Sequence, residues 1–91
     1  MPKYVIERDL PGADDLSDAD IGTVSERSNT VRSEMGGDVQ RLHSYVTGDK
    51  LFCVYIAPNE DRVREHDSRG GFPADAVREV ARMIDPTIGG A

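Results

Sequence analysis

The stretch Leu42–Pro58, LHSYVTGDKLFCVYIAP, constrains the fold of this chain more than any other. Apolar and β-branched residues lie on both sides of Thr47–Lys50 (TGDK), and a short glycine-containing turn between two such runs is the strongest local signal of a β-hairpin. The same stretch holds His43, one of two histidines, and Cys53, the only cysteine. We therefore expect a hairpin that carries much of the reactive chemistry of the chain.

The length of the turn decides which side chains share a face of this hairpin. An even-length turn places Val46 opposite Leu51, and we prefer it because Gly-Asp suits a primed turn. One face then carries Leu42, Ser44, Val46, Leu51, Cys53 and Tyr55, and the other carries Arg41, His43, Tyr45, Phe52, Val54 and Ile56. A three-residue loop with a bulge would instead place His43, Tyr45, Cys53 and Tyr55 together.

The segment before the hairpin predicts a strand and a long helix. Lys3–Arg8 has strand propensity, and Pro11-Gly12 stops the run. Ser17 is suited to cap a helix that ends at Gly36-Gly37. Apolar or small residues recur at helical spacing between these points, at Ile21, Val24, Ser28, Val31 and Met35.

The segment after the hairpin predicts a second helix and a last strand. Asn59 is a plausible cap, the helix is expected to run to Ser68 or Arg69, and Gly70-Gly71 ends it. The apolar residues of Val77–Asp85 fit a helical period. The part from Val80 to Asp85 also fits the alternating pattern of a strand. We prefer a strand, because a third helix would leave a three-stranded sheet with an open edge.

The resulting order predicts an α+β fold, a ferredoxin-like βαββαβ sandwich with two helices on one face of a four-stranded antiparallel sheet. We expect a single domain over residues 1–86 and a C-terminal tail over residues 87–91. The other face of the sheet stays open and is partly apolar through Phe52, Val54 and Ile56. Because 91 residues bury a modest core, we expect a homodimer through this open face.

Composition excludes several classes of partner. The chain has 17 acidic and 11 basic residues, a net charge of −6, and its basic residues are scattered. A nucleic-acid partner or an anionic membrane requires a basic surface, so we expect neither. No apolar run approaches the roughly 20 residues of a membrane span, and the N-terminus lacks the apolar core of a signal peptide. We therefore expect a cytoplasmic protein.

Five motifs resemble a family of small bacterial proteins of uncharacterised function, one member of which is described as a nickel-binding protein. They are ERDLPG (Glu7–Gly12), HSYV (His43–Val46), CVYIAPNE (Cys53–Glu60), REH (Arg64–His66) and GGFPAD (Gly70–Asp75). The resemblance extends from about Pro2 to Pro86. It implies a ferredoxin-like fold, dimerisation through the sheets and a nickel site.

His43 is the first candidate for a metal ligand. In the preferred register its side chain lies beside Tyr45 on the open face, where a dimer would form a pocket. A neutral imidazole can bind Ni(II), Zn(II) or Cu(II), or it can act as a general base. The competing interpretation is a histidine that is hydrogen-bonded in an interface.

His66 and Cys53 are further candidate ligands. No HxxxH, CxxC or HExxH spacing accompanies them. His66 lies late in the second helix, where a histidine also serves as a helix-end cation. Its neighbours Glu65 and Asp67 are not expected to share its helix face. Cys53, in mid-strand, is otherwise a small core residue.

Together these features predict a small soluble metal-binding protein that binds Ni(II) or another divalent transition metal as a homodimer, without an organic cofactor. We favour a binding protein over an enzyme. The alternative is a small organic ligand, or acid–base chemistry, in a pocket between sheet and helices. The candidate pocket residues are Tyr45, Glu7 and Tyr55. A third hypothesis is an interaction module with no site.

Overall fold

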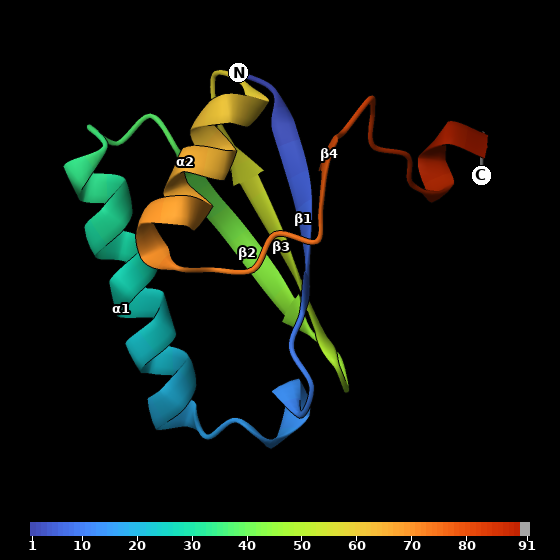
Figure 1. The fold of residues 1–91 in the computed structure, drawn as a ribbon. Helices are drawn as coiled ribbons and strands as arrows, with labels where there is room; N and C mark the ends of the chain where they lie inside the picture. Colours follow the sequence, from blue (N-terminus) through green and yellow to red (C-terminus); the bar gives the residue numbers. More distant parts are fainter. Residues whose placement is uncertain (90–91) are drawn as a thin grey trace.

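Two helices cover one face of a four-stranded antiparallel sheet in the computed structural model, which describes residues 1–89 (Figure 1). The elements in chain order are β1 (Lys3–Asp9), a 3-10 turn (Ala13–Asp15), α1 (Asp18–Glu34), β2 (Gln40–Val46), β3 (Lys50–Ile56), α2 (Glu60–Gly70), β4 (Ala76–Glu79) and a 3-10 turn (Pro86–Gly89). The strand order is β2-β3-β1-β4. This arrangement confirms the ferredoxin-like fold. Residues 90 and 91 of the predicted tail lie outside the described residues.

Both helices begin at the predicted caps. The Ser17 hydroxyl accepts a hydrogen bond from the Asp20 N–H at 3.1 Å, and the Asp20 carboxylate accepts one from the Ser17 N–H at 3.3 Å. This reciprocal pair is a capping box, which satisfies two N–H groups at the start of α1. Asn59 Oδ1 accepts from the Arg62 N–H at 3.0 Å and caps α2 in the same way. None of the helices in the described part of the chain is long and apolar enough to cross a membrane.

The hairpin has the predicted even register at its turn and a bulge farther along. Val46 lies opposite Leu51 and His43 opposite Val54, but Arg41 lies opposite Tyr55. Leu42 is therefore an extra residue in β2, and one extra residue reverses the alternation of side chains beyond it. As a result, the predicted face of Arg41 is wrong: its side chain lies on the helix-covered side of the sheet with Ser44, Cys53 and Tyr55.

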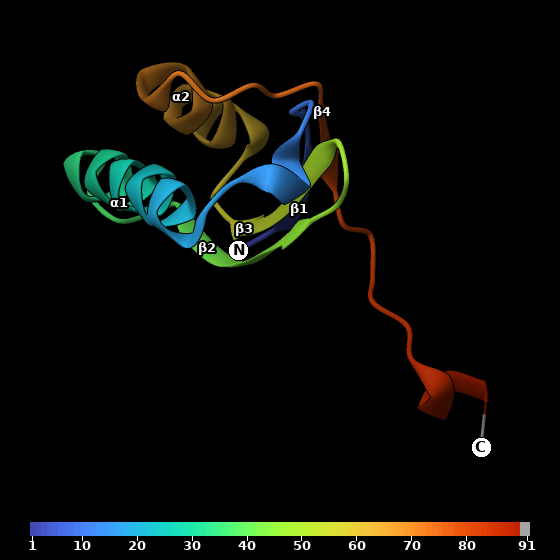
Figure 2. The ribbon, with the colours of Figure 1, turned by 90° about the horizontal axis from the view of Figure 1, so that it is seen from below.

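The last strand is shorter and earlier than predicted. β4 covers Ala76–Glu79 and pairs with Tyr4–Glu7 of β1, whereas Val80–Asp85 forms no strand. The end of β4 is set by the end of its partner strand, β1. The Val80 N–H donates to the Lys3 carbonyl at 2.8 Å, and Lys3 is where β1 begins, so little backbone remains to pair. Beyond Val80 the chain leads away from the sheet (Figure 2).

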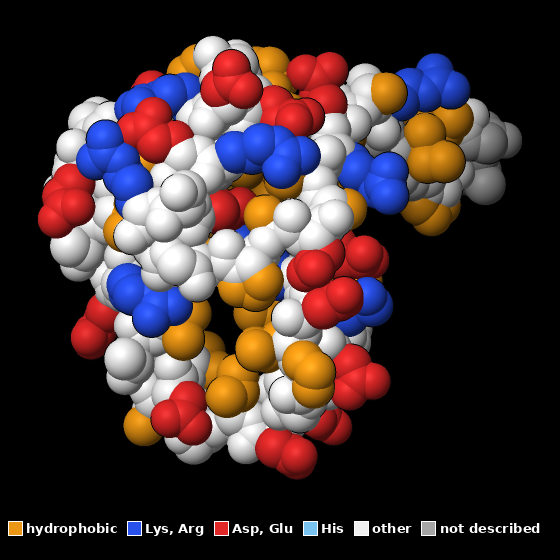
Figure 3. Space-filling view, in the orientation of Figure 1, with side chains coloured by type: hydrophobic (Ala, Val, Ile, Leu, Met, Phe, Trp, Pro, Cys, Tyr) orange, Lys and Arg blue, Asp and Glu red, His pale blue; other side chains and the backbone are white. Residues whose placement is uncertain are grey.

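The core lies between the sheet and both helices, and from α1 only the C-terminal half contributes to it. Its buried side chains are Tyr4, Ile6, Val31, Met35, Val39, Cys53, Tyr55, Ala57 and Val63. Of the predicted stripe on α1, Val31 and Met35 are buried, but Ile21 is 41% exposed. The first turns of α1 thus stand off from the sheet, and a hollow with hydrophobic walls opens there (Figure 3).

Gly70 and Gly71 end α2 for two different reasons. Gly71 has a φ of 68° and forms the left-handed C-cap that the sequence predicts. At Gly70 the constraint is space, because a Cβ there would lie 2.1 Å from Cε2 of Phe72. The Phe72 ring is itself stacked on His66, with ring centroids 5.4 Å apart. Gly70 therefore permits the contact that closes the end of α2.

Alanine substitutions at two helical glycines should have opposite effects. Gly70→Ala forces the Phe72 ring off His66 and should lower the free energy of unfolding by about 1–3 kcal/mol. Gly22→Ala, in α1 with no atom near its added Cβ, should raise it by about 1 kcal/mol through helix propensity. Urea denaturation of both variants measures the difference. A Gly70→Ala protein as stable as Gly22→Ala would contradict the assigned contact.

Candidate functional site

His43 and Tyr45 lie together on the face of the sheet that no helix covers. Their rings meet edge to face, with centroids 5.2 Å apart, and Tyr45 is 61% exposed. They line a groove of about 310 Å³, which also borders Val5, Val54 and Met83. The charged side chains of this groove are Lys3 and Arg82. The groove therefore offers one accessible imidazole and no carboxylate.

Glu7 shares this open face but lies apart from His43. It is opposite Phe52, which separates it from Tyr45 on the far strand. Its carboxylate lies 3.8 Å from Nζ of Lys50, which also pairs with Asp9. The structure thus places Glu7 in a solvent-exposed ion pair at the end of β1.

His66 and Tyr55 lie on the opposite, helix-covered side. His66 is fully buried, with Nδ1 at 3.0 Å from Asp67 Oδ1 and Nε2 at 3.0 Å from Ser28 Oγ. The Tyr55 hydroxyl is 3.4 Å from the same Ser28 oxygen, and burial raises the pKa of Tyr55. Both imidazole nitrogens are therefore engaged within the protein.

The contact between His66 and Asp67 corrects an expectation from the sequence. Adjacent helical residues were expected to face apart, yet both side chains are buried and bonded to each other. Successive side chains on a helix diverge by about a quarter of a turn, so both can border one buried side. The next residue of this network is Arg8, which bonds Asp67. The alternation of side chains in β1 indicates its position, since Arg8 falls on the same buried face as Tyr4 and Ile6.

Arg8 and Asp67 form the ion pair at the centre of this buried network. Arg8 is 3% exposed and Asp67 2%, and Nη2 donates to Oδ1 at 2.9 Å. The other terminal nitrogen donates to the Pro73 carbonyl at 2.6 Å. Burial opposes the charge on Arg8, but the hydrogen bond and charge of Asp67 outweigh it, and the pKa of Arg8 is raised.

The order Ser28–His66–Asp67 has the connectivity of a nucleophile, a base and an orienting acid. A nucleophile must reach substrate, however, and Ser28 is buried and does not border the hollow beside α1. We therefore assign this chain of hydrogen bonds to the stability of the fold.

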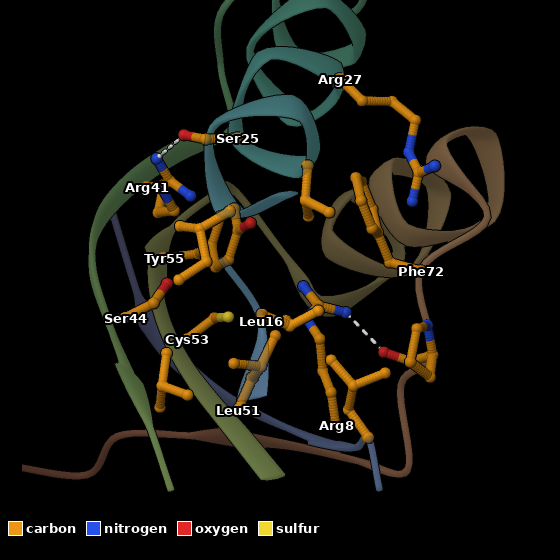
Figure 4. Close-up of a pocket in the computed structure, with 15 residues that line it drawn as sticks. Arg8, Leu16, Ser25, Arg27, Arg41, Ser44, Leu51, Cys53, Tyr55 and Phe72 are labelled. Carbon is orange, nitrogen blue, oxygen red and sulfur yellow. Dashed lines mark hydrogen bonds between the residues drawn. The ribbon is translucent and has the colours of Figure 1, made fainter. Parts of the chain in front are cut away.

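The hollow beside α1 is a cavity of about 170 Å³ between the helix, the sheet and the loops after β1 and α2. Its walls are mainly apolar, through Leu10, Leu16, Ile21, Val24, Val46, Leu51, Phe72 and Pro73. Its polar lining consists of Arg8, Arg27, Arg41, Ser25, Ser44, Cys53 and Tyr55 (Figure 4). Arg27 reaches this cavity from α1, and Arg41 reaches it because of the bulge in β2. Reasoning from the sequence missed both, since the bulge has no local signal and Arg27 is not on the predicted apolar stripe.

The three predicted metal ligands, His43, His66 and Cys53, do not lie close together within a single copy of the protein. His43 is on the open face, whereas His66 and Cys53 are on the helix-covered side. Over residues 1–89, no group of three or more His, Cys, Asp or Glu side chains has a metal-binding arrangement.

Comparison with known proteins identifies a relationship over most of the chain. Residues 4–80 match the family described as nickel responsive protein SCO4226-like. Among solved structures, SCO4226 from Streptomyces coelicolor A3(2) is similar in fold, with a TM-score of 0.76 and 14% sequence identity. The match covers 90% of this chain and 99% of that one. Curated proteins gave no significant match.

Breaking the buried ion pair should destabilise the protein strongly. Arg8→Met leaves the Asp67 carboxylate buried without its cation and should lower the free energy of unfolding by about 3–5 kcal/mol. The double variant Arg8→Met/Asp67→Leu removes both charges and should recover part of this loss, because His66 Nδ1 then lacks its Asp67 partner.

Chemical denaturation measures both variants, and Arg64→Met is the matched control. Arg64 pairs with Glu60 at the surface and should change stability little. A double variant that is as unstable as Arg8→Met would show that the lost stability does not come from the stranded charge.

Proposed function

Because the chain belongs to the nickel responsive protein SCO4226-like family, we propose that it is a small protein that binds Ni(II), or a similar divalent transition metal, as a homodimer. The observation that carries this proposal is the position of His43. Its imidazole lies in an exposed groove on the open face of the sheet, whereas the other histidine is buried and bonded on both nitrogens.

Imidazole is a suitable ligand for this class of metal. Ni(II), Cu(II) and Zn(II) bind neutral imidazole nitrogen, while softer thiolate ligands favour Cu(I) and Zn(II). Cys53 is buried beneath the helices, so it does not share the groove with His43. We therefore base the metal site on His43 and on neither of the other two candidate ligands.

A second copy of the chain supplies the ligands that one copy lacks. A single imidazole binds a divalent metal weakly, and the described residues contain no larger set around His43. Two copies that meet through their open faces, about a two-fold axis that passes beside His43, would bring their two His43 side chains to one site. Val5, Val54 and Tyr45 give this face its apolar surface.

The metal proposal predicts a loss of nickel binding in His43→Ala. Chelator-treated wild-type protein should bind Ni(II) in a calorimetric titration, because His43 is accessible to the metal. His43→Ala should abolish the heat of Ni(II) binding in the same titration. Ser44→Ala is the matched control, since the neighbouring side chain lies on the other side of the sheet and binding should persist. Micromolar or tighter binding by His43→Ala would contradict the assignment.

The dimer proposal predicts that a charge on the open face separates the subunits. Tyr45→Glu places a carboxylate in the proposed interface, where a two-fold axis would repeat it, so sedimentation should show a monomer. Thr23→Glu adds the same charge on exposed α1 and should leave a dimer. If Tyr45→Glu sediments like Thr23→Glu, the open face is not the interface.

A further inference from the structure

The cavity beside α1 is separate from the proposed metal site and has the features of a small-molecule pocket. It lies across the sheet from His43, and the core does not fill it. Its volume of about 170 Å³ compares with the roughly 150 Å³ cavity that admits a benzene molecule in another protein. Leu10, Leu16 and Leu51 give it walls that suit a short aliphatic or aromatic group.

The charge of this cavity is opposite to that of the protein. The chain has a net charge of −6, yet three arginines and no acidic residue line the cavity. The charge of Arg8 is compensated by Asp67 at 2.9 Å. Over residues 1–89, neither Arg27 nor Arg41 forms an ion pair with a carboxylate. Two cationic side chains therefore border an apolar space without an anionic partner.

Arg41 is oriented toward this space by two structural features. The bulge at Leu42 turns its side chain to the cavity side, and bulges commonly re-aim side chains next to binding sites. Its Nη2 then donates to Ser25 Oγ at 2.6 Å, which fixes the guanidinium against α1 (Figure 4). A guanidinium presents parallel N–H groups that match the two oxygens of a carboxylate.

We propose that this cavity binds a small organic monocarboxylate, with its carboxylate on Arg41 and its apolar body among Leu16 and Leu51. Ser25 can donate its hydroxyl proton to the same carboxylate, since its oxygen accepts from Arg41. Arg27, held over the Phe72 ring at 4.6 Å, adds positive potential from another wall. The apolar lining selects against small inorganic anions, which have no body to fill it.

Calorimetry with hexanoate as the probe tests this site, with 1-hexanol as its uncharged counterpart. The protein is chelator-treated, so that no metal contributes. Hexanoate should bind saturably and at least tenfold more tightly than 1-hexanol, because the alcohol lacks the charge-assisted hydrogen bonds to Arg41. Equal binding of the two probes, or no saturable binding of hexanoate, would overturn the proposal.

Substitutions test whether the hexanoate carboxylate binds at Arg41 and Ser25. Arg41→Gln should weaken hexanoate binding by roughly tenfold or more, and Ser25→Ala should weaken it to a smaller extent. Arg64→Gln removes the same charge from the exposed surface of α2 and should bind like wild type, as should His43→Ala on the other face. Thermal melting confirms that each variant is folded. Wild-type affinity in both Arg41→Gln and Ser25→Ala would refute the assignment of the anchor.

Discussion

The buried contact between Arg8 and Asp67 determines how the helical layer sits on the sheet. Removing two charges from water is unfavourable, and here it is offset by the ion pair itself, by the Pro73 carbonyl and by the Phe72 ring, 5.5 Å from the guanidinium carbon. These contacts join β1 to α2 and to the loop that follows it. Asp67 also bonds His66, and His66 reaches Ser28 on α1. The Arg8–Asp67 pair and its hydrogen-bonded neighbours therefore link β1 in the sheet to both helices.

The sheet separates the groove on its open face from the cavity beside α1, and β2 lines both. His43 and Tyr45 face the open groove, whereas Ser44 and Arg41 face the cavity. Regular alternation alone would have placed Arg41 beside His43, in the groove that Lys3 and Arg82 already border. The bulge at Leu42 moves this charge to the other side. A single extra residue thus places the Arg41 guanidinium on the opposite side of the sheet from the His43 imidazole.

The sequence predicts the parts of the fold that depend on local chemistry. The caps at Ser17 and Asn59 and the turn that pairs Val46 with Leu51 follow from residue types and spacing. The bulge has no local signature, because Leu42 fits an unbroken alternation. The end of β4 depends on where β1 begins, a property of the partner strand. Ile21 keeps the helical period, but its side chain is 41% exposed and borders the cavity instead of the core.

The position of the cavity follows from the position of the polar contacts. α1 is held through Ser28, Val31 and Met35, which lie in its C-terminal half or at its C-cap, against the layer fixed by Asp67. Nearer its N-terminus, α1 is joined to β2 by the hydrogen bond from Arg41 to Ser25, and the space above Leu51 is left open. A larger apolar side chain in the first turns of α1 would fill this cavity and extend the hydrophobic core. The chain instead places arginines around it, and an arginine beside an apolar space is most stable when an anion is present.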